Sequence, residues 1–261
     1  MTFPAMPIKI LTTFILIIGA AAAVRGADMS ERFQARTYTS KKYSTLPYRL
    51  LVPPNYDKGK KYPLVLFFHG VGERGTDNRK QLYCGLDIFA GENRMKRYPC
   101  FIAAPQCPVE TKWAEVDWKA ARHTMQNDPT PPLAMSIEIV ADLQREFSID
   151  TGRIYVTGYS MGGFATWEAI QRWPDLFAAA VPVCGGGDEA LAPRLVHMPI
   201  WAFHGALDSI VNVRRSRNMI NAIVRAGGMP RYSEYTLITH LCWNFTYTDD
   251  AMFDWLFKQK K

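Results

Sequence analysis

Short apolar runs that alternate with helical patterns most constrain how this chain can fold. The first clear run, residues 62–68, has no polar side chain apart from a tyrosine, and such a run is typical of a strand buried on both faces. Later runs span residues 101–104, 154–157, 178–183 and 200–203, with a more mixed one at 232–238. Helical patterns span residues 133–147, 161–173, 211–226 and 249–258. This alternation predicts an α/β fold with a mostly parallel, twisted sheet and helices on both faces.

Two stretches rich in Thr, Tyr and Leu, residues 36–40 and 48–52, precede the first buried run. Turn-prone residues separate them, which predicts an antiparallel pair at one edge of the sheet. No linker rich in Pro, Gly or Ser divides the 261 residues and no internal repeat is present, so we predict a single domain over residues 27–261. The composition, 48% hydrophobic and 21% charged, excludes a disordered or coiled-coil chain.

The amino terminus, residues 1–26, has the pattern of an export signal. Lys9 precedes an uncharged stretch whose strongly apolar part is short and ends in small residues. A membrane-spanning helix needs about 20 mostly apolar residues, so a cleaved signal peptide is favoured over an uncleaved anchor. Cleavage after Ala23 or Gly26 predicts a secreted or periplasmic protein with no stable membrane anchor after processing.

Charge and cysteine usage exclude several kinds of site. The 31 Lys plus Arg and 24 Asp plus Glu give a formal net charge of +7, and their interspersion argues against a nucleic-acid partner. Five cysteines, an odd number, leave at least one free or paired with another molecule. They are Cys84, Cys100, Cys107, Cys184 and Cys242. No zinc spacing, P-loop or dinucleotide fingerprint is present, so no metal and no cofactor is expected; cysteine pairing and oligomeric state are left open.

One motif combines a special position with reactive chemistry. Gly158-Tyr159-Ser160-Met161-Gly162 lies between the apolar run 154–157 and a helical pattern. A serine in a sharp, strained strand-to-helix turn needs small neighbours, because a larger side chain would clash with adjacent backbone. The context predicts Ser160 as a nucleophile.

A serine hydroxyl needs a base to take its proton, and in this arrangement the chain order is serine, acid, histidine. Two of the five histidines precede Ser160, a third lies before the run 200–203, and His204 ends that run ahead of the acid favoured here. His240, after the last strand, is therefore the predicted base. Asp208 is the predicted acid that orients it, with Asp188 as the competing candidate.

Two backbone amides are expected to stabilise the negative oxygen that develops during attack. One is the amide of Met161, which follows the nucleophile. The second comes from the glycine-rich loop 69–75, where we favour Val71, with Gly72 as the alternative.

Several blocks of the sequence together resemble the α/β-hydrolase serine esterases. The blocks are His69-Gly-Val-Gly-Glu-Arg-Gly75, Ala104-Pro-Gln-Cys-Pro108, the serine motif, Cys184-Gly-Gly-Gly-Asp188, His204-Gly-Ala-Leu-Asp208 and His240-Leu-Cys-Trp243. The resemblance runs over residues 43–257. Within this group, the sequence more specifically resembles secreted bacterial feruloyl and acetyl esterases and polyhydroxybutyrate depolymerases, which are related to prolyl oligopeptidase. The resemblance implies a triad of Ser160, Asp208 and His240, in agreement with the order argument.

The resemblance also implies a reaction class, the hydrolysis of carboxylic esters through an acyl-enzyme. The expected substrate is a small-molecule or polysaccharide-linked ester, of the feruloyl or acetyl type found on plant polysaccharide. Trp113, Trp118 and Trp243 are predicted to form an aromatic wall for it. Two alternatives remain: a peptidase or amidase of the prolyl-oligopeptidase type, and a non-catalytic carbohydrate-binding protein on a hydrolase scaffold.

Overall fold

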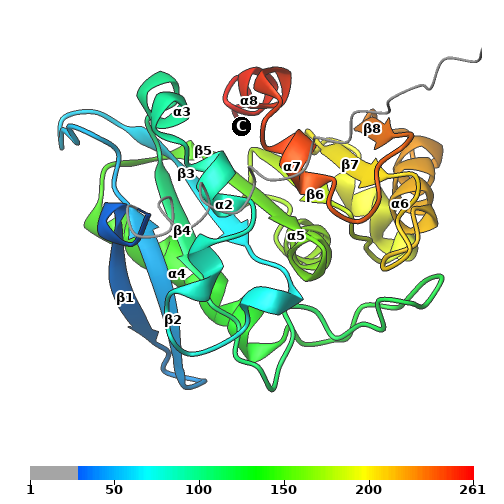
Figure 1. The fold of residues 1–261 in the computed structure, drawn as a ribbon, viewed down its shortest axis with the longest axis horizontal. Helices are drawn as coiled ribbons and strands as arrows, with labels where there is room; N and C mark the ends of the chain where they lie inside the picture. The colour runs from blue at the N-terminus through cyan, green and yellow to red at the C-terminus, as the bar shows by residue number, and fades with distance from the viewer. Residues whose placement is uncertain (1–28) are drawn as a thin grey trace, which may run out of the picture.

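The computed structural model describes residues 29–261, so the predicted signal peptide and both cleavage positions lie outside the described residues. One eight-stranded sheet, in the order β1-β2-β4-β3-β5-β6-β7-β8, runs through the molecule (Figure 1). Its strands are β1 (Phe33–Thr39), β2 (Thr45–Leu51), β3 (Tyr62–Phe68), β4 (Phe101–Pro105), β5 (Ile149–Tyr159), β6 (Ala179–Val183), β7 (Trp201–Gly205) and β8 (Arg231–Tyr235).

The pairing confirms a mostly parallel sheet with an antiparallel pair at one edge. Strands β3 to β8 are mutually parallel, whereas β2 pairs antiparallel with both β1 and β4. Every residue of β3 is buried, as its unbroken apolar run predicts. Strand β5 begins five residues before its apolar run, and the pattern did not predict this part because residues 150–153 are not apolar and keep part of their surface exposed.

Helices cover both faces of the sheet, as predicted. One core contains side chains of α4 (Pro131–Glu146), α5 (Met161–Arg172) and α6 (Arg214–Arg225). The other contains side chains of α2 (Leu86–Phe89), α3 (Glu92–Arg97), α7 (Trp243–Thr246) and α8 (Asp250–Leu256). Alternate residues of β3 enter the two cores, since successive side chains of a strand point to opposite faces.

The sequence did not predict α2, α3 or α7, because four to six residues are too short to show a helical period. The 3-10 turns η1 (Val71–Glu73), η2 (Lys80–Leu82) and η3 (Glu189–Leu195) are short as well, with at most seven residues. Helix α6 begins three residues later than its pattern suggested. Over residues 29–261 no helix combines the length and the apolar character needed to cross a membrane.

The long connection between β4 and α4 is held to the helices through its own backbone. The Arg172 guanidinium donates hydrogen bonds to the carbonyls of three successive residues, 126–128, at 2.6 to 3.2 Å. Arg215, which is almost wholly buried, donates to the Ala120 carbonyl at 3.3 Å. The connection is therefore a fixed part of the fold, although it contains no long element of its own.

Candidate active site

Ser160 lies in the turn between β5 and α5, with φ 56° and ψ −120°. This left-handed backbone is rare for a residue with a side chain, and the close packing around it explains why it persists. A Cβ on Gly162 would lie 2.1 Å from the Phe68 carbonyl oxygen, and one on Gly158 would lie 2.6 Å from the same atom. Only glycine fits at either position, so the turn has the steric form that the motif predicts.

The structure brings together the three residues predicted as a triad. His240 Nε2 lies 2.8 Å from Ser160 Oγ, and His240 Nδ1 lies 2.7 Å from Asp208 Oδ2. The Asp208 side chain is fully buried, whereas the His240 side chain keeps 15% of its surface exposed. A carboxylate accepts but cannot donate, so Nδ1 carries the proton and Nε2 is free to accept one from Ser160.

Neighbouring parallel strands explain how residues so distant in sequence meet. Strands β7 and β8 are adjacent, and Asp208 and His240 follow their carboxyl ends. The Leu207 amide donates to the Ile238 carbonyl at 3.0 Å. A Cβ on Gly205 would lie 2.1 Å from the Thr239 carbonyl oxygen. The glycine thus lets the loop that carries His240 pass directly against the turn that carries Asp208.

Both oxygens of the Asp208 carboxylate are fully engaged. Oδ1 accepts the amides of Ile210 and Val211, each at 2.9 Å, and Oδ2 accepts from His240 and from His204 Nε2 at 3.1 Å. Burial by itself would raise the pKa of Asp208, but the hydrogen bonds from the two histidines hold that pKa well below its usual range. The carboxylate is therefore an anion at neutral pH, available to stabilise a positive charge on His240.

The competing acid, Asp188, has a different position. Its side chain accepts the amides of Met125 and Ala190, at 2.9 and 3.0 Å. These bonds fasten the long connection and cap η3. His204, which the sequence argument set aside, contacts the acid directly; the four-residue spacing between His204 and Asp208 was the available signal for that contact.

The two amides predicted to form an oxyanion hole open two adjacent turns. Met161 is the first residue of α5 and Val71 the first of η1, and no side chain caps either turn. The amides at the start of a helical turn have no intrahelical acceptor. Strands β3 and β5 are paired up to Phe68 and Gly158, which places the two turns side by side. Their role as oxyanion donors stays a prediction.

His69 ties the Val71 loop to the end of β4. Its Nδ1 lies 2.6 Å from the Gly70 carbonyl and its Nε2 accepts the Cys107 amide at 2.9 Å. Its own carbonyl accepts from Trp113 Nε1 at 3.2 Å. These partners require a neutral ring protonated on Nδ1, and complete burial lowers the pKa of His69 to about 4.

Folding stability should therefore fall as the pH drops from about 6.5 to about 4. The unfolded His69 takes up a proton near pH 6.5, whereas the folded ring resists protonation until about pH 4. The folded state binds fewer protons in this window, so acid favours unfolding, by about 3 kcal/mol in all for this group. Urea midpoints measured at pH 7.0 and 4.5 test this for the wild type, His69→Gln and the exposed-histidine control His197→Gln. If the urea midpoint fell between pH 7.0 and 4.5 by as much in His69→Gln as in the wild type, the prediction would be contradicted.

The three tryptophans predicted as an aromatic wall occupy different environments. Trp113 is 0% exposed and packs against Phe68 at 5.0 Å between ring centroids. The prediction for Trp113 is wrong, because no face of the ring is open to a substrate. Trp243 is 8% exposed, with its ring perpendicular to His240 at 5.5 Å, so it braces the histidine. Trp118 is partly buried beside Lys112, and its contact with substrate stays a prediction.

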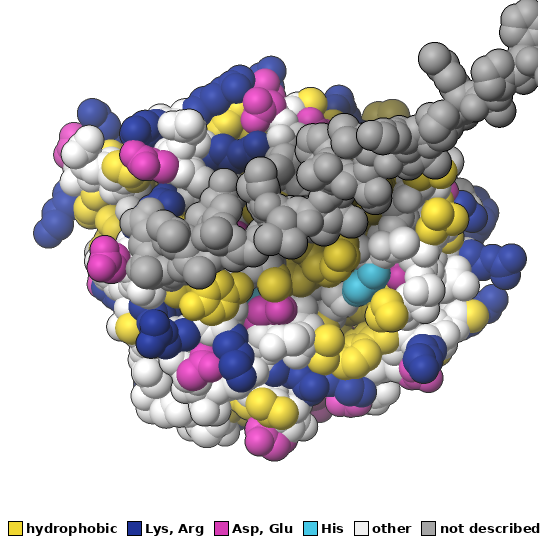
Figure 2. Space-filling view, in the orientation of Figure 1, with side chains coloured by type: hydrophobic (Ala, Val, Ile, Leu, Met, Phe, Trp, Pro, Cys, Tyr) yellow, Lys and Arg dark blue, Asp and Glu magenta, His cyan; other side chains and the backbone are white. Residues whose placement is uncertain are grey.

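Sequence reasoning missed an apolar rim around the triad. Four large apolar side chains, each at a predicted site residue or within two positions of one, are more than one third exposed. They are Val71, Leu207, Ile210 and Leu241. In the view of Figure 2 a histidine side chain is exposed, with hydrophobic side chains close to it. Val116 of the long connection lies instead in a small buried cluster with Phe164 and Val211.

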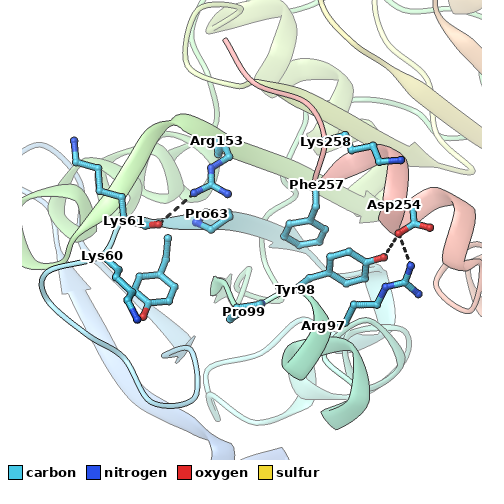
Figure 3. Close-up of a pocket in the computed structure, with 11 residues that line it drawn as sticks. Lys60, Lys61, Pro63, Arg97, Tyr98, Pro99, Arg153, Asp254, Phe257 and Lys258 are labelled. Carbon is cyan, nitrogen blue, oxygen red and sulfur yellow. Dashed lines mark hydrogen bonds and ion pairs between the residues drawn. The ribbon is translucent and has the colours of Figure 1, made fainter.

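A separate cavity of about 350 Å³ lies near the amino-terminal end of β3, whereas the triad lies beyond the carboxyl ends of the strands (Figure 3). Its cationic side chains include Arg97, which bonds Asp254 at 2.7 Å, and Arg153, which donates to the Lys61 carbonyl. Tyr98 also donates to Asp254. The cavity is lined by no member of the triad.

Comparison with known proteins agrees with this geometry. The prolyl oligopeptidase family model matches residues 134–192. A solved structure of a thermostable esterase is 39% identical, with a TM-score of 0.82 over 88% of this chain and 64% of its own. Feruloyl esterase D of Neurospora crassa is 25% identical over 84% of this chain and 75% of its own length.

A shorter similarity links the chain to a bifunctional acetylxylan esterase/xylanase of Neocallimastix patriciarum. The two are 33% identical over 82 residues, which is 30% of this chain and 12% of the relative. The chain thus spans less than two thirds of that relative and of the thermostable esterase. Since 88% of the chain superposes on an esterase with TM-score 0.82, and the sheet has the order described above, the chain has the α/β-hydrolase fold and is similar to esterases of that fold.

Proposed function

We propose that the protein is a secreted serine hydrolase that cleaves carboxylic esters through an acyl-enzyme. The observation that carries this proposal is the continuous hydrogen-bonded chain from Ser160 Oγ through His240 to Asp208 in a strained strand-to-helix turn. A nucleophile, a base and an orienting acid within hydrogen-bond reach are the requirement for acyl transfer.

The acylation step follows from the protonation states in the site. Ser160 Oγ attacks the ester carbonyl carbon while His240 Nε2 takes the hydroxyl proton. The amides of Met161 and Val71 are the proposed donors to the resulting oxyanion. The carbon–oxygen bond to the alcohol then breaks, and His240 returns its proton to the departing alcohol, which leaves Ser160 esterified.

Deacylation repeats the sequence with water as the nucleophile. His240 takes a proton from the water as it attacks the acyl carbon, and it then protonates Ser160 Oγ as the acid product leaves. During both steps the Asp208 carboxylate stabilises the imidazolium. The low pKa of Asp208 keeps that carboxylate charged throughout.

The proposed substrates are feruloyl- or acetyl-type esters of plant polysaccharide. The apolar rim of Val71, Leu207, Ile210 and Leu241 suits a short or aromatic acyl group, and two relatives are named as a feruloyl esterase and an acetylxylan esterase. The sequence has no long apolar insertion that would cover a fatty acyl chain.

A substrate panel tests this proposal. Methyl ferulate, p-nitrophenyl acetate and acetylated xylan should give kcat/KM values at least about tenfold above that of p-nitrophenyl palmitate. A fluorophosphonate probe should label Ser160, since its Oγ displaces fluoride from phosphorus. Preference for the long chain would overturn the substrate class, and absence of both turnover and labelling would favour the non-catalytic alternative.

A peptidase or amidase is the second candidate, because the prolyl oligopeptidase family model matches residues 134–192 around the nucleophile. Peptide p-nitroanilides with proline or alanine before the scissile bond should be cleaved far more slowly than the short esters. Activity confined to these amides would replace the esterase proposal.

Secretion is proposed from the amino-terminal sequence, Lys9 followed by an apolar run and small residues. Amino-terminal sequencing of exported protein should find a chain that starts at Val24 or Ala27. Export with an intact amino terminus would argue instead for an uncleaved anchor.

A further inference from the structure

We propose that His204 is a positioning residue of this site: through Nε2 it holds the Asp208 carboxylate in the orientation that His240 requires. The inference rests on the proposed function. It extends the site by a residue that is not part of the Ser-His-Asp order and that never reaches the substrate.

The proton on His204 Nε2 is determined by its partners. Nε2 lies 3.1 Å from Asp208 Oδ2 and 3.0 Å from the Val211 carbonyl oxygen. Neither oxygen has a hydrogen to give, so Nε2 carries the proton and donates. Because His204 is 0% exposed, water does not compete for this donor.

The other side of the ring is anchored as well. His204 Nδ1 lies 2.8 Å from Ser216 Oγ, and Ser216 Oγ lies 3.0 Å from the Gly185 carbonyl. The Ser216 hydroxyl can donate to Nδ1 of a neutral ring. It can also accept from a protonated ring while it donates to Gly185. Fixing both nitrogens removes the freedom of the ring to rotate.

The place of His204 in the fold explains why it can orient the acid. His204 lies within β7, and it is in register with Glu234 of β8. Asp208 and His240 lie on loops beyond the ends of these strands. A group fixed on a strand holds its geometry better than one on a loop, so His204 gives the Asp208 carboxylate a rigid reference within the sheet.

Oδ2 is the oxygen for which this reference matters. Oδ1 is held by two backbone amides of its own turn, at Ile210 and Val211. Without His204, Oδ2 would keep a single donor, His240 Nδ1, which is itself on a loop. The hydrogen bond from His204 therefore keeps the Asp208 carboxylate aligned with His240 Nδ1, and not merely close to it.

Two substitutions at this position separate the donor from the bulk of the ring. In His204→Gln the side-chain amide nitrogen reaches the place of Nε2 and donates the same hydrogen bond, whereas the shorter amide of His204→Asn does not reach. We expect kcat on p-nitrophenyl acetate to fall about 10- to 100-fold in the Asn variant, with KM within about threefold. The Gln variant should stay within about fivefold of the wild type.

The pH profile is the readout that a purely structural role would leave unchanged. If Asp208 loses its alignment, the protonated His240 loses stabilisation, so the acidic limb of kcat/KM should move about one pH unit lower in His204→Asn. His197→Asn, at an exposed histidine outside the site, is the matched control and should reproduce the wild-type profile. Circular dichroism and thermal melting establish that each variant is folded.

Equal losses in the Asn and Gln variants with an unmoved acidic limb would overturn the proposal, as would wild-type kinetics in His204→Asn. If His204→Asn does not fold, Ser216→Ala tests the same idea by freeing the Nδ1 side of the ring. We expect kcat about threefold lower there with the limb displaced in the same direction, and unchanged kinetics would also overturn the proposal. A wild type that hydrolyses no ester and resists the fluorophosphonate would instead refute the proposed function.

Discussion

The Ser160→Ala variant is expected to hydrolyse p-nitrophenyl acetate about 10⁶-fold more slowly than the wild type. The substitution removes the atom that becomes esterified, so no acyl-enzyme forms and His240 has no hydroxyl proton to take. What remains is the contribution of binding and of the oxyanion donors to direct attack by water. Steady-state kinetics and loss of fluorophosphonate labelling measure the effect.

Ser136→Ala is the matched control for the nucleophile. Ser136 is also buried, but its hydroxyl donates only to the Pro132 carbonyl of its own helix. This variant should keep wild-type kcat and probe labelling. A Ser160→Ala variant with more than about one thousandth of wild-type activity would show that a different nucleophile operates.

The second large effect is expected in Asp208→Asn, with kcat about 10⁴-fold lower. An amide has one acceptor and one donor end, whereas the site offers only donors: two amides face Oδ1 and two histidines face Oδ2. With NH₂ towards His240, the ring is driven to the tautomer protonated on Nε2, which cannot accept the Ser160 proton. With NH₂ towards Ile210 and Val211, two backbone donors lose their acceptor.

Asp188→Asn distinguishes the two acids that the sequence left in competition. Its carboxylate fastens Met125 and Ala190, so its loss should reduce stability and leave kcat within about tenfold of the wild type. The Asp208→Asn loss is measured as kcat at pH 7 with a fold check by circular dichroism. Loss of activity at Asp188 rather than at Asp208 would reverse the assignment of the acid.

The parts of the fold that sequence predicts best are those determined by local pattern. The buried run at Tyr62–Phe68 forms β3 with the predicted bounds, because burial on both faces leaves a continuous apolar signature. The relation of Ser160, Asp208 and His240 was also predictable, since parallel strands bring their carboxyl ends to one edge.

The wrong and missed residues depend on three-dimensional packing that a hydrophobic pattern does not record. Trp113 lies in a loop, where an aromatic side chain can be exposed to a substrate. The path of that loop instead buries Trp113 against Phe68, and no local sequence pattern predicts this path. His204 was set aside because its place in the chain order is unsuitable for a base. Its contact with Asp208 arises from the shape of a single turn, which periodicity does not describe.

The backbone anchoring of the β4–α4 connection has a consequence for how its own sequence can change. Arg172 and Arg215 grip carbonyl oxygens, and every amino acid supplies a carbonyl. Substitutions in residues 120–128 can therefore alter the surface that the connection presents while its path stays the same. The path of this segment therefore depends little on which side chains it carries, so it can accept sequence changes without displacing the helices that hold it.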